Sequence, residues 1–228
     1  MRLVNVLKSV ILKARNLLKP NPDRFLRHAK GVIHVGANSG QERDQYAALG
    51  LPVVWIEPIP EVFAKLTANL RGFPRQRAVQ ALVTDRDDVE YNFHVANNSG
   101  ASSSIFDFGL HKDIWPEVGY ERTIKITSKT LARVLEEEKV DVARYDVLVM
   151  DTQGSELLVL KGAEPLLPHF SFIKTEVPDF ESYAGCVQLP ELTEFLVRNG
   201  FRELSRHRFA RHSSGGSYFD IVYSRRRA

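Results

Sequence analysis

Cysteine is almost absent from this sequence: Cys186 is the only one among 228 residues. A single cysteine cannot form a disulfide within the chain, and no Cys or His residues have the close spacing of a zinc site. These absences exclude a disulfide-stabilised secreted scaffold and a thiolate-ligated metal centre. They favour a reducing compartment, so we expect a cytoplasmic protein.

No apolar run is long enough to span a membrane, although the N-terminus is amphipathic. Apolar residues within residues 1–19 recur at the three- and four-residue spacing of one helical face, and basic residues occupy the other face. Lys8, Lys13 and Arg15 interrupt the segment, which is too short for a transmembrane helix of about 20 residues. Residues 1–27 are predicted to form a basic amphipathic helix and a linker, which either docks on protein or lies peripherally on the inner membrane face.

An excess of charge of one sign is also missing. Lys and Arg number 31 against 28 Asp and Glu, for a net charge of +3, and the basic residues collect at the two ends of the chain. This distribution indicates either an anionic partner surface or simply solvated termini. Because the basic residues are not interleaved with aromatic ones, we expect no nucleic-acid partner.

Residues 28–228 are predicted to form one domain, because short apolar runs alternate with segments of helical period. The expected strands cover residues 32–35, 53–56, 77–82, 90–95, 123–126, 147–150, 172–175, 202–206 and 218–223. The expected helices cover residues 42–49, 61–70 and 191–198, one from a Ser128 cap to residue 138, and one that ends at Lys161 with Gly162 as its cap. The pattern predicts an α/β fold with a doubly wound, mostly parallel sheet and an antiparallel C-terminal hairpin edge.

The first expected strand runs into a glycine-bearing turn, Gly36-Ala37-Asn38-Ser39-Gly40. Ligands of open α/β sheets bind at the carboxyl ends of the strands, and glycines let backbone N–H groups approach a ligand. Glu57 follows the second strand, where an acidic side chain can accept both hydroxyls of a ribose. Asn38 and Gln41 stand where a dinucleotide-binding turn needs glycine. The pattern therefore favours an adenosine ligand with an amino-acid tail, such as S-adenosylmethionine, over NAD.

The polar stretch of residues 97–120 is longer than an ordinary connection. Loops of this length often bind a substrate, and the alternative is a mobile surface excursion. Phe106, Phe108 and Trp115 within the stretch favour partial packing, because their apolar area is costly to leave in water.

Three separated motifs resemble the FkbM-type S-adenosylmethionine-dependent methyltransferases. They are the Gly36 turn, Trp55-Ile56-Glu57-Pro58, and the residues from Val149 to Glu156, followed by Leu160-Lys161-Gly162-Ala163. The resemblance covers residues 30–223 and implies a Rossmann-like class I methyltransferase fold, with a seven-stranded sheet whose last strand is antiparallel. It also implies O-methylation of a sugar or another hydroxyl-bearing acceptor. His34 departs from the family pattern, because many members carry Asp two residues before the first glycine.

The resemblance also assigns cofactor-binding residues. It implies that Gly36, Asn38 and Gly40 line the methionine tail and that Glu57 holds the ribose. Ala81 and Leu82 are expected beside the adenine, and Asp85 within reach of its amino group. The other expected cofactor-binding residues are His34, Pro58 and Asp151. For Asp85 the alternative is a role in capping the turn of residues 85–88.

Methyl transfer to a hydroxyl is helped by a base that takes its proton. Asp151 and Glu176 end two strands that are neighbours in this fold, so we expect both carboxylates to face the methyl donor, and either is a candidate base. The pair can also hold a divalent cation, although two carboxylates leave most of a six-oxygen shell unfilled and a metal is not favoured. Alternatively, Asp151 binds N–H groups at the next helix start and Glu176 pairs with Lys174. His94 and His111 are further candidate bases.

The leading hypothesis is thus an S-adenosylmethionine-dependent O-methyltransferase that acts on a glycan or a related small-molecule acceptor. The alternative is a binding protein that keeps the fold without catalysis, or a membrane-associated assembly protein. An NAD-dependent oxidoreductase is disfavoured by Asn38 and Gln41 and by the absence of a Tyr-x-x-x-Lys pair. Neither the acceptor nor the oligomeric state follows from the sequence.

Overall fold

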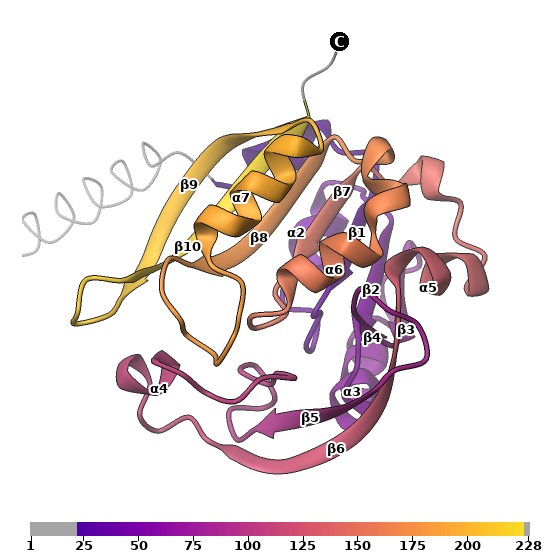
Figure 1. Cartoon of the computed structure of the whole chain (residues 1–228). Coiled ribbons are helices and arrows are strands. Elements are labelled where there is room, and N and C mark those ends of the chain that lie inside the picture. The colour runs from indigo at the N-terminus through magenta and orange to yellow at the C-terminus, as the bar shows by residue number, and fades with distance from the viewer. Residues whose placement is uncertain (1–21, 226–228) are drawn as a thin grey trace, which may run out of the picture.

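The computed structural model describes residues 22–225 of the chain (Figure 1). The amphipathic helix expected in residues 1–19 lies outside these residues, and of the expected N-terminal linker only the part from Pro22 onward is described. Within residues 22–225, no helix is long and apolar enough to cross a bilayer.

A seven-stranded sheet forms the centre of the fold, in the order β3-β2-β1-β7-β8-β10-β9. The strands are β1 Val32–Val35, β2 Val53–Glu57, β3 Gln76–Gln80, β7 Val147–Met150, β8 Phe172–Pro178, β9 Phe201–Arg211 and β10 Ser217–Arg225. The pairs from β3 to β8 are parallel, and β10 is antiparallel to both β8 and β9. This arrangement confirms the predicted doubly wound, mostly parallel sheet with an antiparallel last strand.

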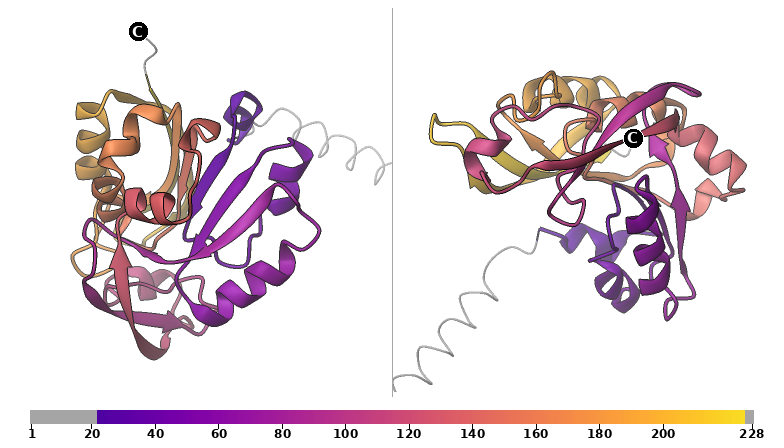
Figure 2. Two further views of the ribbon diagram at one scale, coloured as in Figure 1. Left: turned by 90° about the vertical axis from the view of Figure 1, so that its right-hand side faces the viewer. Right: turned by 90° about the horizontal axis from the view of Figure 1, so that it is seen from below.

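Helices cover both faces of this sheet (Figure 2). The first face carries η1 Arg24–His28, α2 Arg43–Ala48 and α3 Pro60–Asn69, and the second face carries α5 Leu131–Glu137, α6 Glu156–Gly162 and α7 Leu189–Arg198. Three further helices are α4 His111–Ile114, η2 Val142–Arg144 and η3 Glu164–His169. Because β1 and β7 are fully covered, their residues form an unbroken apolar run except for His34.

A second sheet of three strands, in the order β4-β6-β5, lies beside the central one. Its strands are β4 Leu82–Val83, β5 Glu90–Ala96 and β6 Tyr120–Lys129, and the latter two run along the lower edge of the molecule in Figure 1. The single strand expected over residues 77–82 is therefore wrong in its last part. The chain leaves the central sheet after Gln80, and Leu82 pairs with Ser128 of β6 instead.

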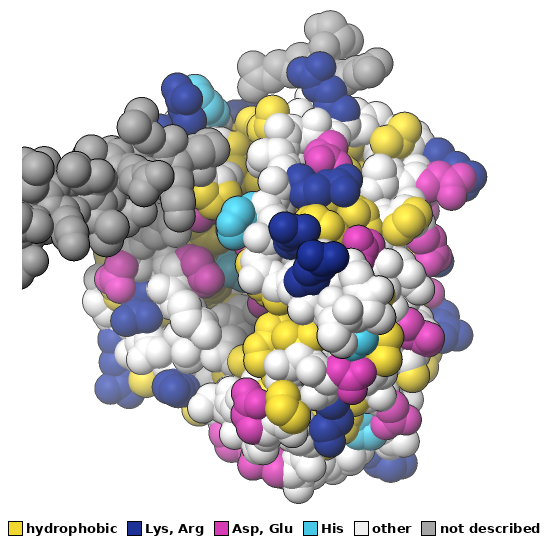
Figure 3. Space-filling model, turned by 90° about the vertical axis from the view of Figure 1, so that its left-hand side faces the viewer, with side chains coloured by type: hydrophobic (Ala, Val, Ile, Leu, Met, Phe, Trp, Pro, Cys, Tyr) yellow, Lys and Arg dark blue, Asp and Glu magenta, His cyan; other side chains and the backbone are white. Residues whose placement is uncertain are grey.

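The edge strand β9 is exposed along most of its length and is rich in arginine. Its exposed arginines are Arg202, Arg206, Arg208 and Arg211. Lys and Arg side chains gather on this side of the molecule (Figure 3). Charged side chains on an edge strand discourage pairing with the sheet of another molecule.

Two predicted helix caps are wrong. Ser128 lies in β6, and its hydroxyl donates to the carbonyl oxygen of Arg86 at 2.7 Å. The next polar residue, Thr130, caps α5 by accepting the N–H of Arg133. Gly162 is the last residue of α6 rather than its cap, and a Cβ atom there would lie 2.0 Å from the carbonyl oxygen of Thr84. This glycine is required because α6 packs directly against the backbone that follows β4.

We predict that Gly162→Ala destabilises the protein by about 1–3 kcal/mol, because the backbone at Thr84 must move to admit the methyl group. In an unobstructed helix the same change stabilises by about 1 kcal/mol. The free energy of unfolding in urea measures the difference. Gly72→Ala is the control, because no atom lies within 4 Å of a Cβ placed there. A Gly162→Ala protein as stable as the wild type would contradict the close approach.

Candidate active site

The turn after β1 lies against the end of β7. Gly36 has a φ of 78°, and a Cβ atom there would lie 1.9 Å from the carbonyl oxygen of Asp151. Asn38 also has a positive φ, 43°, which asparagine tolerates better than most residues. Only glycine fits at position 36, and the contact brings Asp151 next to the β1 turn.

The N–H groups of this turn already donate within the protein. Those of Gly36 and Ala37 bond to the carbonyl oxygen of Ile56 at 3.0 and 3.1 Å. The next three bond to the Glu57 carboxylate, the Asn38 side chain and the Ala37 carbonyl oxygen. The expectation that this turn presents free N–H groups to a ligand is therefore wrong. The turn contributes close-packed backbone to the site.

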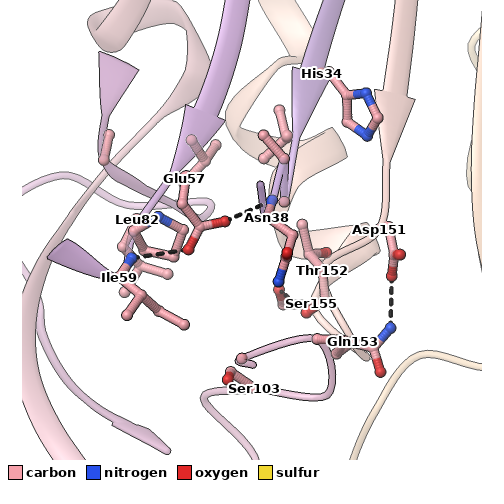
Figure 4. A pocket seen from close by; sticks show the side chains of 18 of the residues that line it. His34, Asn38, Glu57, Ile59, Leu82, Ser103, Asp151, Thr152, Gln153 and Ser155 are labelled. Carbon is pink, nitrogen blue, oxygen red and sulfur yellow. Dashed lines mark hydrogen bonds between the residues drawn. The ribbon is translucent and has the colours of Figure 1, made fainter. Parts of the chain in front are cut away.

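Glu57 is held rigidly at the end of β2. Its side chain is buried, with Oε2 accepting the N–H of Asn38 and Oε1 accepting the N–H of Ile59, both at 2.9 Å (Figure 4). Burial raises the pKa of Glu57 to about 7, and the hydrogen bonds from the two N–H groups oppose this rise. Each oxygen keeps a second lone pair, so the carboxylate can accept two adjacent hydroxyls, as on a ribose.

A cavity of about 830 Å³, partly open to solvent, lies at the carboxyl ends of β1, β2 and β7. Its wall brings together most of the expected cofactor-binding residues: His34, Gly36, Asn38, Glu57, Pro58, Ala81, Leu82 and Asp151. Ile59, Val83 and Phe93, which sequence reasoning missed, add apolar wall near Leu82. A fixed carboxylate beside an apolar surface fits the ribose and adenine of S-adenosylmethionine, and we call this space the cofactor cavity.

Two expected cofactor residues do not line the cofactor cavity. Gly40 has a φ of 73°, and a Cβ atom there would lie 2.8 Å from Cδ1 of Leu66 in α3, so the glycine serves the packing of that helix. Asp85 lies in the turn between β4 and β5, where its Oδ1 is 3.7 Å from Nε of Arg86. The structure does not bring Asp85 to the wall of the cavity.

His34 reaches the wall of the cofactor cavity from β1, but it is engaged by its neighbours. Its ring stacks on Trp55 at 4.8 Å between centroids, and Nδ1 is 3.3 Å from the hydroxyl of Tyr46. Burial, with a smaller contribution from Lys174, lowers the pKa of His34 to about 3. The imidazole is therefore neutral at physiological pH.

A second cavity, of about 980 Å³ and partly open to solvent, adjoins the cofactor cavity. The two cavities share Ala101, Asp151 and Gln153 as wall residues. Glu176 lines the second cavity as well, so the structure brings the two expected carboxylates together. A group placed in the second cavity can meet the contents of the first beside Asp151, and we call the second space the acceptor cavity.

Asp151 lies between the two cavities, and its exposed surface forms part of the wall of each. Burial raises its pKa to about 7, repulsion by Glu156 adds to the rise, and a hydrogen bond from Gln153 opposes it. Burial raises the pKa of Glu176 well above the ordinary value, and Asp151 and Asp220 reinforce this. The two carboxyl groups therefore disfavour each other's ionised form.

A chain of hydrogen bonds orients Asp151. The Tyr183 hydroxyl donates to Oε1 of Gln153 at 2.6 Å, and Nε2 of Gln153 donates to Oδ1 of Asp151 at 2.6 Å. Because Tyr183 is buried and occupies the amide oxygen, the amide nitrogen faces Asp151 (Figure 4). Gln153 adopts a φ of 52°, and Ser104 donates to its carbonyl oxygen at 2.7 Å. Among residues 22–225, no hydrogen bond to Oδ2 of Asp151 accompanies the one to Oδ1.

His94, the third expected catalytic residue, lines neither cavity. Its Nδ1 is 2.9 Å from the Thr123 hydroxyl and its ring stacks on Tyr120. Successive side chains of a strand point to opposite faces, and on β5 it is Phe93 that reaches the cofactor cavity. His94 therefore belongs to the packing of the second sheet.

The long connection of residues 97–120 supplies much of the acceptor cavity. Asn97, Asn98, Ser102, His111, Trp115, Glu117 and Val118 lie on its wall. The N–H groups of Gly109 and His111 bond to the carbonyl oxygen of Ser182 at 2.9 and 3.0 Å, so the connection is tied to the segment after β8. Phe209 of β9 completes the wall, and no sequence motif marks it.

His111 is buried in this connection. Its Nδ1 is 2.8 Å from the Tyr218 hydroxyl, and Nε2 has no hydrogen-bond partner among the described residues. Burial lowers the pKa of His111 to about 4, so the imidazole is neutral at physiological pH. It is a weak base under these conditions, in contrast to Asp151.

Asp151 and Glu176 are not joined by a third His, Cys, Asp or Glu in a metal-binding group within residues 22–225. The carboxylates of the site instead have protein donors or each other as neighbours.

The model of the methyltransferase FkbM domain matches residues 34–203. No curated protein sequence matches the chain. Among solved structures, an uncharacterised protein from Listeria monocytogenes serotype 4b is similar over 87% of this chain, with a TM-score of 0.50 and 11% identity. This chain spans 63% of that protein, which is less than two thirds of its length.

Two further solved structures are similar at lower scores. TrmK of M. capricolum, in complex with S-adenosyl-homocysteine, has a TM-score of 0.47 and 7% identity, over 86% of this chain and 62% of its own. The magnesium protoporphyrin IX methyltransferase of Synechocystis PCC 6803 has a TM-score of 0.44 and 10% identity, over 86% of this chain and 69% of its own.

We predict that Asp151→Asn stabilises the protein at alkaline pH. The pKa of Asp151 is about 7 in the folded chain and about 3.9 when unfolded. The stability that its proton supplies is complete below the unfolded value and is lost as the pH rises through the folded value. The gain in Tm from Asp151→Asn should therefore be larger at about pH 8.5 than at about pH 5.5.

Thermal unfolding at the two pH values measures this gain. Asp44→Asn, at an exposed position of α2, is the control. An equal change in Tm at both pH values for Asp151→Asn would contradict the raised pKa.

Proposed function

The chain belongs to the FkbM methyltransferase family, and we propose that it transfers the methyl group of S-adenosylmethionine to a hydroxyl of a neutral, sugar-like acceptor. Family membership makes it an S-adenosylmethionine-dependent methyltransferase. The class of acceptor, the methylated atom and the roles of single residues are the proposal.

The observation that carries the proposal is the meeting of the two cavities at Asp151 and Gln153. Bound in the cofactor cavity, S-adenosylmethionine supplies an electrophilic methyl group on a sulfonium sulfur. An acceptor hydroxyl in the adjoining cavity lies next to the Asp151 carboxylate. A base at this junction can act on the acceptor without contacting the adenosine part of the cofactor.

Asp151 is the proposed general base. As the acceptor oxygen forms its new bond to carbon, its proton passes to Oδ2 of Asp151, and the products are a methyl ether and S-adenosylhomocysteine. A pKa of about 7 suits a base that works near neutral pH. Gln153 and Tyr183 hold the carboxylate in one orientation, so they are positioning residues.

The wall of the acceptor cavity suits a neutral polyhydroxyl compound. The amides of Asn97 and Asn98 each donate and accept one hydrogen bond within the long connection and keep one N–H and one lone pair for a hydroxyl. The carboxylates can also bond to hydroxyls. The rings of Trp115 and Phe209 offer apolar surface to the C–H groups of a sugar. No Lys or Arg among residues 22–225 lines either cavity, so a phosphate or a nucleic-acid backbone finds no cationic partner there.

Transfer of labelled methyl from S-adenosylmethionine to a panel of neutral sugars, sugar phosphates and RNA tests the proposal. We expect transfer to a neutral sugar or glycan. Asp151→Asn should lower turnover about 10²- to 10⁴-fold. It should leave the Kd of S-adenosylhomocysteine nearly unchanged, because Glu57 and the apolar wall bind the adenosine.

Glu57→Gln is the matched variant, in which the affinity for S-adenosylhomocysteine should fall. Asp44→Asn should change neither quantity. Methyl transfer to RNA and to no sugar would contradict the acceptor class, and unchanged turnover in Asp151→Asn would contradict the role of the base.

A further inference from the structure

The methionine part of S-adenosylmethionine carries an ammonium group, which needs an anionic partner once it leaves water. His34 cannot supply the charge, because it is neutral and engaged with Trp55 and Tyr46. The N–H groups of the Gly36 turn are occupied and would in any case repel a cation. A carboxylate on the wall of the cofactor cavity can supply this charge.

Three carboxylates line this cavity: Glu42, Glu57 and Asp151. Glu57 is fixed by two N–H groups beside the apolar wall, at the adenosine end. Asp151 is bonded to Gln153 at the junction with the acceptor cavity. The Glu42 carboxylate is half-buried and accepts no hydrogen bond or ion pair from another described side chain. Of the three, Glu42 is the carboxylate that bonds to no other described residue, because its one hydrogen bond is to its own backbone.

We propose that the Glu42 carboxylate binds the ammonium group of the methionine moiety and so takes the place of an acidic residue at position 34. The inference rests on the cofactor cavity described above. Glu42 precedes α2, follows the Gly36 turn by a few residues, and lines the same cavity as that turn.

The nearby cation does not compete for this carboxylate. Lys174 lies close enough to influence the pKa of Glu42, but its Nζ is 2.7 Å from Oδ1 of Asp23. The side chains of Asp23 and Lys174 are 20% and 22% exposed, and Asp23 also accepts a hydrogen bond from Nε2 of Gln45 at 3.1 Å. Glu42 therefore remains available to a cationic group that enters from the cavity.

Isothermal titration of the full chain tests the assignment with three probes: S-adenosylhomocysteine, its deaminated analogue, and 5′-methylthioadenosine, which lacks the amino-acid part. Glu42→Gln should weaken the binding of S-adenosylhomocysteine about ten- to hundredfold, as expected for loss of a charge-assisted hydrogen bond. It should leave the other two affinities unchanged. Asp44→Asn, two residues further on and exposed, should bind all three probes like the wild type.

The remaining outcomes distinguish failure of the Glu42 assignment from failure of the proposed function. Equal affinity of Glu42→Gln and wild type for S-adenosylhomocysteine overturns the inference. An equally large loss of affinity for 5′-methylthioadenosine in Glu42→Gln also overturns it, because such a loss indicates a general disturbance of the cavity. A third contradicting result is that Asp151→Asn, and not Glu42→Gln, selectively weakens the binding of the probe that carries the ammonium group. If the wild type binds none of the three probes, it is the proposed function that fails.

Discussion

The contact of Gly36 with the carbonyl oxygen of Asp151 is the constraint on which the site depends. A Cβ atom at position 36 would overlap this oxygen, so the ends of β1 and β7 can approach only because the side chain is missing. The approach carries Asp151 to the edge of the cofactor cavity. It also lets N–H groups of the turn bond to the carbonyl oxygen of Ile56 and to the side-chain carboxylate of Glu57 in β2. One close approach at the centre of the sheet thus links three strands to both cavities.

Local patterns were enough to predict much of this arrangement. Buried apolar runs located the central strands, and the glycine turn and Glu57 located the cofactor cavity, because these features depend on residues near one another in the sequence. Hydrogen bonding within the turn was not predictable, since the carbonyl oxygen of Ile56 reaches Gly36 only after β1 and β2 have paired. Phe93 and His94 differ by one position, and only the pairing of β5 decides which faces the cavity. Phe209 joins the wall from a distant strand.

The buried carboxylates of the site destabilise the folded chain when no ligand is bound. Burial raises the pKa values of Glu57, Asp151 and Glu176, which means that each ionised form costs free energy in the absence of a ligand. Groups of this kind concentrate at functional sites. Here they share a sign, and no Lys or Arg among residues 22–225 lines the cavities to neutralise them. Such a wall is suited to a cationic ligand.

This charge arrangement also resolves a conflict in the role of Asp151. A base must be ionised before it can take a proton, yet a pKa of about 7 leaves a large fraction protonated at neutral pH. A positive charge in the adjoining cofactor cavity favours the ionised form and lowers this pKa. Glu176 lines the acceptor cavity and not the cofactor cavity, and burial raises its pKa well above the ordinary value. In the proposed reaction, a cationic cofactor would therefore also favour the ionised, proton-accepting form of Asp151.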